Sequence, residues 1–154
     1  MKLGIFGSRT LKDDRVRELI YDELAETGAD TIVTTQEPLG VCTVAQVVAK
    51  ESGLVLELHF LNFQKYAKGA FRLRSQEVID ASDKILLIHD GKSKGTSNEL
   101  AQVQKSNKPY RYEVMPPTDE TLQKTKDVKL DAFSAKTDGL HNAKKQGFDF
   151  DFNF

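Results

Sequence analysis

Two short polar stretches each follow an apolar run and carry residue types suited to binding an anion. In Gly7-Ser8-Arg9 the glycine permits a sharp turn, the serine offers a hydroxyl, and the arginine offers a planar guanidinium suited to phosphate or carboxylate. Asp90-Gly91-Lys92-Ser93-Lys94-Gly95-Thr96 breaks a strand and opens a helix, where free backbone N–H groups favour a phosphate. These stretches predict ligand contacts from Gly7, Ser8, Arg9, Asp90, Gly91, Ser93, Gly95 and Thr96.

Several side chains also have a structural interpretation. Thr96 and Glu99 have the spacing of a capping box, which would start a helix near residue 97. Arg74 is either a ligand contact or part of the basic flank of a helix surface. His59 is either an acid–base group or an ordinary loop histidine, and we expect Cys42 to be an inert small residue.

Composition narrows the class of protein. The chain has 154 residues and a net charge of −1, so the overall basic character of a nucleic-acid-binding protein is missing. A single cysteine excludes an intrachain disulfide framework and a cysteine-rich zinc site. The N-terminal apolar run is too short for a signal peptide, and no run approaches membrane-spanning length. We therefore expect a soluble cytoplasmic protein without membrane contact, and we predict no metal and no cofactor.

The elements that would position these residues alternate between strand and helix. Apolar runs predict five strands, and helical periodicity between them predicts four helices, so we expect an α/β, Rossmann-like three-layer fold with about five parallel strands. Right-handed crossovers would bring Arg9, the 36–42 loop, His59 and the Gly95 corner to one sheet edge. The expected strands cover residues 2–6, 31–34, 55–58, 85–88 and 110–114, and the expected helices residues 14–27, 43–52, 66–81 and 97–106.

The chain changes character after residue 115. Residues 1–115 form the predicted domain, and in residues 116–154 apolar residues become sparse, which predicts a mostly flexible extension. Its tip, Phe148–Phe154, alternates phenylalanine with acidic or amide residues, which suits an extended strand with one apolar face. That tip would add to a sheet edge of a protein partner or of its own chain, or fold back over the domain.

The two polar stretches resemble motifs of the YspA-like branch of the SLOG superfamily, which is related to the LOG phosphoribohydrolases, DprA and the nucleoside deoxyribosyltransferases. The G-S-R after the first strand matches at 7–9, and the D-G-x-S-x-G-T before the last helix matches at 90–96. Tyr66, Ala70 and Arg74 match part of a further family motif. The likeness covers residues 1 to about 115.

The second loop departs from the family pattern. Gln36 and Glu37 stand where the family has two glycines, Gly40 matches, and Cys42 replaces an aspartate. The added side chains and carboxylate would hinder close approach of a phosphate to the backbone. We therefore expect this loop to bind a different ligand from the one that the family binds, or no ligand.

The resemblance implies three alternative functions. The first is a module that binds a nucleotide or a derivative such as an ADP-ribose compound, with Gly40 and Arg74 among its ligand contacts. The second is an N-glycosidic hydrolase or transferase with Glu99 as catalytic residue at the anomeric carbon, where a carboxylate stabilises an oxocarbenium-like transition state. The third is a protein-interaction module that acts through Phe148–Phe154. The resemblance also implies a homodimer or a higher oligomer.

Overall fold

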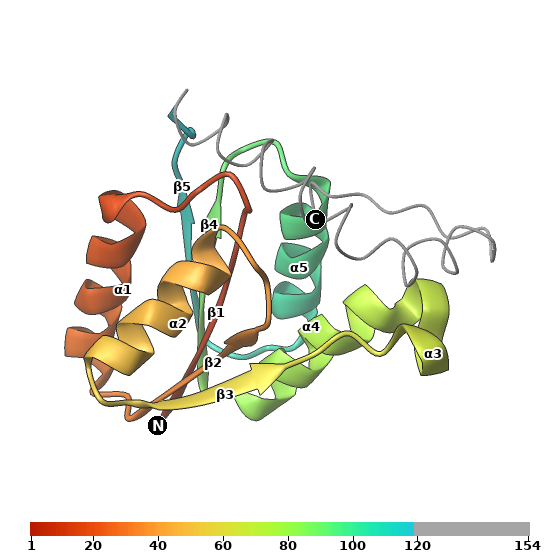
Figure 1. Ribbon diagram of the computed structural model, residues 1–154, viewed down its shortest axis with the longest axis horizontal. Coiled ribbons are helices and arrows are strands. Elements are labelled where there is room, and N and C mark those ends of the chain that lie inside the picture. The colour runs from red at the N-terminus through yellow and green to blue at the C-terminus, as the bar shows by residue number, and fades with distance from the viewer. Residues whose placement is uncertain (119–154) are drawn as a thin grey trace.

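The computed structural model describes residues 1–118 and consists of a parallel sheet between two layers of helices (Figure 1). The strand order is β3-β2-β1-β4-β5, and every neighbouring pair is parallel. The predicted α/β, Rossmann-like fold is therefore confirmed. The strands are β1 (Lys2–Gly7), β2 (Thr31–Thr35), β3 (Val55–His59), β4 (Lys84–His89) and β5 (Tyr110–Val114).

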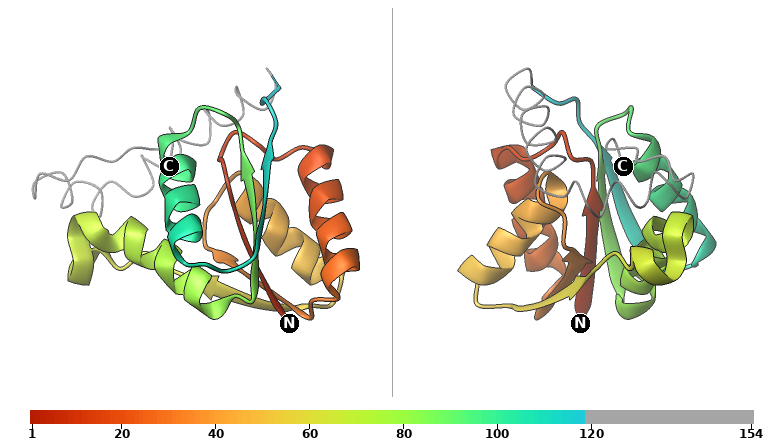
Figure 2. Two further views of the ribbon diagram at one scale, coloured as in Figure 1. Left: turned by 180° about the vertical axis from the view of Figure 1, so that it is seen from behind. Right: turned by 45° about the vertical axis from the view of Figure 1, so that its right-hand side comes forward.

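Helices cover both faces of the sheet, as Figure 2 shows from two further directions. Helices α1 and α2 lie on one face, and α4 and α5 lie on the other (Figure 1). This places a crossover helix between each pair of successive strands, as parallel pairing requires. The helices are α1 (Asp14–Thr27), α2 (Val41–Glu51), α3 (Phe63–Tyr66), α4 (Ala70–Ala81) and α5 (Lys94–Lys105), with a 3₁₀ turn at Ala67–Gly69 between α3 and α4.

The apolar runs of the central strands supply two cores, one on each face. Leu3 and Ile5 of β1 and Ile88 of β4 pack with Val16 of α1 and Val48 of α2. The side chains that point to the opposite face of the same strands pack with α4 and α5. In this second core, Phe6, Ile85 and Leu87 contact Val78, Ile79 and Val103. All of these side chains are fully buried, and burial of each contributes about 1.5–3 kcal/mol.

The starts and ends of several helices follow predicted signals. The carboxylate of Asp13 accepts a hydrogen bond from the amide of Arg15 and caps α1, and Gly28 ends that helix in the left-handed conformation.

The predicted helix over residues 66–81 is wrong in its first turn. Ala67 has φ +47, a conformation that an α-helix cannot contain, so the chain forms α3 and a 3₁₀ turn before α4 begins.

The predicted start of α5 is also wrong. The helix begins at Lys94 rather than near residue 97, and Ser93 is its N-cap residue. Thr96 lies inside the first turn, where its hydroxyl is 3.0 Å from that of Ser8. Glu99 accepts a hydrogen bond from the Ser75 hydroxyl of α4. The interpretation of Thr96 and Glu99 as a capping box is therefore wrong, and both side chains instead face neighbouring elements.

Candidate functional site

The predicted polar stretches meet at the point where the strand order reverses. Strands β1 and β4 are neighbours, yet the helices that follow them, α1 and α5, cover opposite faces. The loops after such a pair separate, and ligands of open α/β sheets bind in the resulting crevice. Gly7-Ser8-Arg9 follows β1 and Asp90–Ser93 follows β4, so both lie at this place.

Ser8 joins the two loops and α5. Its fully buried hydroxyl accepts a 3.0 Å hydrogen bond from the amide of Asp90 and lies 3.0 Å from the hydroxyl of Thr96. Its carbonyl oxygen accepts from the amide of Val41 at the start of α2. Ser8 thus fixes the positions of three elements around the site, and its hydroxyl is already engaged within the protein.

Asp90 shapes the loop that leads into α5. One carboxylate oxygen accepts from the amides of Lys92 and Ser93, both at 2.8 Å, and the other accepts from the hydroxyls of Thr10 and Ser93 at 2.7 and 2.8 Å. Burial raises the pKa of this carboxyl, but the four hydrogen bonds outweigh burial and lower the pKa to about 2. The carboxylate therefore takes the place that an external anion would occupy on the 92–93 amides.

The first turn of α5 is capped differently from that of α1. Its N-cap residue, Ser93, makes no side-chain hydrogen bond to the helix, because its hydroxyl donates to Asp90. Gly95 and Thr96 are buried in this turn. The positive end of the α5 dipole therefore faces the same region as the loop after β1.

Two arginines converge on one carboxylate beside this helix start. Glu37, in the loop after β2, lies 2.7 Å from Arg9 Nη2 through one oxygen and 2.5 Å from Arg74 Nη2 through the other. The Arg9, Glu37 and Arg74 side chains are 10%, 8% and 2% exposed. We call Arg9 and Arg74 the arginine pair; they come from the loop after β1 and from α4.

Glu99 is the second carboxyl group of this cluster. It is 4% exposed and lies one turn after Thr96 on α5. Burial raises its pKa to about 8; the charge of Arg74 opposes this shift, and the charge of Glu37 adds to it. At neutral pH the group is therefore mostly protonated and uncharged.

A serine, a histidine and an aspartate also come together near the start of α5, but they are not arranged for nucleophilic catalysis. His89 Nε2 is 2.8 Å from Ser97 Oγ, and its Nδ1 is 3.5 Å from Asp90. The amide of Gly91 donates to that Nδ1 at 2.6 Å, so the ring proton belongs on Nε2 and points at the serine. In this tautomer the imidazole cannot accept the Ser97 proton, which is instead donated to the Ser93 carbonyl.

The predicted glycine contacts have structural roles in the same region. A Cβ atom on Gly7 would lie 2.3 Å from the Val41 side chain, so this glycine lets α2 approach β1. Gly40 has φ +81, and a Cβ there would lie 2.4 Å from the Arg9 backbone. Gly91 turns the chain out of β4 with φ +91. Direct ligand contacts of these glycines stay predictions.

Two other candidates have structural roles near this sheet edge. His59 ends β3 beside the 36–42 loop, as predicted, and its carbonyl oxygen accepts a hydrogen bond from the amide of Gln36 at 3.1 Å. Its imidazole contacts Glu57 and Glu77, both at 2.9 Å. Cys42 is buried, and burial raises the pKa of its thiol, which agrees with an inert residue.

The sequence signal for the arginine pair was incomplete. Arg9 and Arg74 are predicted as ligand contacts, but Glu37 is predicted only as an obstacle to the backbone. That it forms ion pairs with both arginines depends on how the loop after β2 packs against α4, which no local pattern encodes. A glutamate in place of a glycine in this loop was the available signal.

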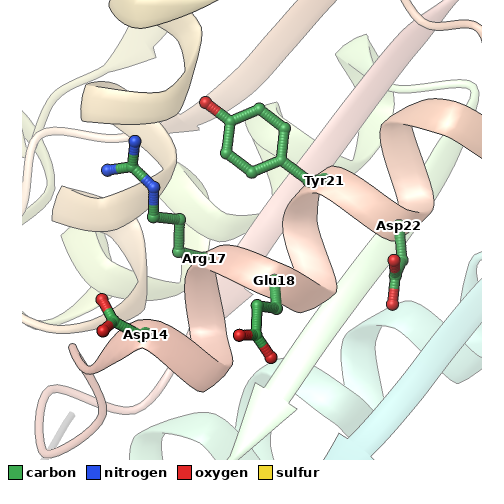
Figure 3. Close-up of a pocket in the computed structure, with 5 residues that line it drawn as sticks. All are labelled: Asp14, Arg17, Glu18, Tyr21 and Asp22. Carbon is green, nitrogen blue, oxygen red and sulfur yellow. The ribbon is translucent and has the colours of Figure 1, made fainter.

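A separate surface depression lies on α1, lined by Asp14, Arg17, Glu18, Tyr21 and Asp22 (Figure 3). Arg17 forms an ion pair with Glu51 and lies over the Tyr21 ring at 5.6 Å. The other charged residues that line the depression are acidic. This depression includes none of the predicted site residues and does not suit an anionic ligand.

Within residues 1–118, no group of His, Cys, Asp or Glu residues is arranged to hold a metal ion. In the same range, no helix has the length and apolar character needed to cross a membrane. The predictions for Phe148–Phe154 lie outside the described residues. Comparison with family models, curated proteins and solved structures found no match.

Proposed function

We propose that this chain is a binding module for a nucleotide or nucleotide derivative, with a phosphate group held by the arginine pair and the first turn of α5. The observation that carries the proposal is the convergence of two buried guanidinium groups on one anion, the Glu37 carboxylate. Arginine is the residue best suited to phosphate recognition, and strand-end crevices are where α/β sheets bind ligands. The resemblance to SLOG motifs at 7–9 and 90–96 supports the same ligand class.

The charges of the site also support an anionic ligand. Because the raised pKa of Glu99, about 8, leaves that group uncharged at neutral pH, the arginine pair contributes two positive charges against the single negative charge of Glu37. The sum over these four residues is +1; the ionised carboxylate of Asp90 is held by four hydrogen bonds of its own within the loop before α5. A positive excess in a buried setting attracts an anion more strongly than the same excess in water.

A second candidate is N-glycosidic hydrolysis or transfer at Glu99. The observation that favours it is a buried carboxyl with a strongly raised pKa beside two arginines, a pattern common in active sites. The same raised pKa argues against the predicted role, because an uncharged acid cannot stabilise an oxocarbenium ion or attack the anomeric carbon. Glu99 is suited only to proton donation, so this candidate ranks second.

Calorimetric titration with AMP and ADP-ribose tests the binding proposal. We expect saturable binding by the wild-type protein, and at least tenfold weaker binding by Arg9→Ala and Arg74→Ala, because a hydrogen bond to a charged group contributes about 1.5–3 kcal/mol. Arg17→Ala removes another ion-paired arginine, on α1, and serves as the matched control.

Two results would count against ranking the binding module above the enzyme. Absence of heat at millimolar AMP and ADP-ribose, with both site variants folded, would remove the binding proposal. Chromatography of the same AMP samples should show no adenine; adenine release that Glu99→Gln abolishes would make the enzyme the better interpretation.

A further inference from the structure

We propose that Glu37 is a built-in competitor of the ligand, which weakens the binding of every anion at the arginine pair, so that only anions that bind the pair tightly, such as phosphate monoesters, occupy the site. This inference rests on the proposed function and deepens it. The Glu37 carboxylate bridges Arg9 and Arg74, at 2.7 and 2.5 Å. A ligand phosphate that contacts both guanidinium groups has to replace it.

The location of Glu37 permits such an exchange. It is buried, but its neighbours Gln36 and Pro38 are exposed, so its loop lies at the surface. Its carbonyl oxygen accepts a 3.0 Å hydrogen bond from the Thr43 hydroxyl, which holds the backbone against α2. The exchange that we infer is a rotation of the Glu37 side chain about this fixed backbone, without a rearrangement of the sheet.

The tethered carboxylate raises the ligand concentration needed to fill the site. Every anion competes against a group that is always present at high effective concentration, and all lose affinity by the same factor. A phosphate monoester carries about 1.5 to 2 negative charges at pH 7 and has three acceptor oxygens, whereas a carboxylate or a phosphodiester carries one negative charge. A terminal monophosphate, as in AMP, therefore displaces Glu37 at a lower concentration than a cyclic monophosphate does.

Glu37→Gln tests this by removing the charge while keeping the size of the side chain. Calorimetry with AMP, 3′,5′-cyclic AMP and inorganic phosphate should show at least tenfold tighter binding of AMP and of phosphate than in the wild type. Cyclic AMP should gain affinity by a similar factor, because removal of the competitor frees the arginine pair equally for every anion. Glu23→Gln is the matched control, because Glu23 is a buried carboxylate that bridges two cations, Lys84 and Arg111, away from the site.

Glu37→Asp is a second variant, which keeps the test valid if Glu37→Gln does not fold. The shorter side chain keeps its charge but cannot reach both guanidinium groups, so AMP should again bind more tightly than to the wild type. If the wild type binds AMP and neither variant binds it more tightly, the inference is wrong and the binding module stands. If neither the wild type nor the folded variants bind any of the three probes, the proposed function fails with it.

Discussion

At the scale of single residues, Glu99 has the most unusual environment in the described chain. It lies buried between α4 and α5, with the Ser75 hydroxyl 3.3 Å away, and its pKa is raised to about 8. A carboxyl group with these properties holds a proton at neutral pH, because burial excludes water and outweighs the opposing charge of Arg74, and the Glu37 carboxylate disfavours a second negative charge nearby. The protonation state of this one group determines the net charge of the site.

The raised pKa of Glu99 predicts a pH-dependent stability. Below about pH 4.5, the ordinary pKa of a glutamate side chain, the group is protonated in both the folded and the unfolded chain. Between about pH 4.5 and 8 only the unfolded chain releases the proton, so the free energy of unfolding decreases as pH rises, by up to about 1.4 kcal/mol per pH unit. Urea unfolding across this range should show that slope in the wild type and a smaller one in Glu99→Gln.

His59 also changes the stability in this pH range, so the test is the difference in slope between the wild type and Glu99→Gln. Burial lowers the pKa of its imidazole, but hydrogen bonds with Glu57 and Glu77 outweigh burial and raise it, so His59 also loses stabilisation as pH rises above about 6.5. The histidine contributes equally to both proteins and cancels. Equal slopes in the wild type and in Glu99→Gln would contradict the assignment of a buried, protonated Glu99.

At the scale of elements, a lysine from the loop before β5 holds the end of α4. Lys108 Nζ donates to the carbonyl oxygens of Ile79 and Ser82, both at 2.7 Å, and of Asp80 at 2.9 Å. These carbonyls belong to the C-terminal end of α4, which carries the negative end of the helix dipole. This ammonium therefore fixes the helix that carries Arg74.

Lys108→Met should reduce the free energy of unfolding by about 1–2 kcal/mol, because three helix carbonyls lose a charged donor. Urea denaturation would measure the loss as a lower midpoint with an unchanged slope. Lys105→Met changes an exposed lysine in the last turn of α5 and should stay within about 0.5 kcal/mol of the wild type. Equal losses in the two variants would show that the capping contacts contribute nothing.

At the scale of the whole molecule, the alternation of strands and helices was sufficient to predict the fold and the meeting of the two polar stretches. Parallel strands with right-handed crossovers have their carboxyl ends at one edge, so Ser8 and Thr96 had to approach once β1 and β4 were neighbours. Which strands lie at the edges was not predictable from periodicity, nor was the pairing of His59 with Glu57 and Glu77.

The details of the site depended on side-chain packing between distant segments. The Glu37 bridge to the arginine pair joins residues 37 positions apart, and Ala67 breaks a helix although alanine favours helices. The sequence also suggested that Thr96 and Glu99 act on their own helix, whereas both contact other elements. Spacing alone could not distinguish these possibilities. The expected oligomer stays a prediction.

A crystal structure of the protein with AMP tests the central claim most directly. We predict that the phosphate oxygens lie about 2.7–3.2 Å from guanidinium nitrogens of both Arg9 and Arg74, that the phosphate faces the first turn of α5, and that Glu37 has turned away from the arginine pair. AMP bound elsewhere on the molecule, with Glu37 still bridging the two arginines, would contradict the account.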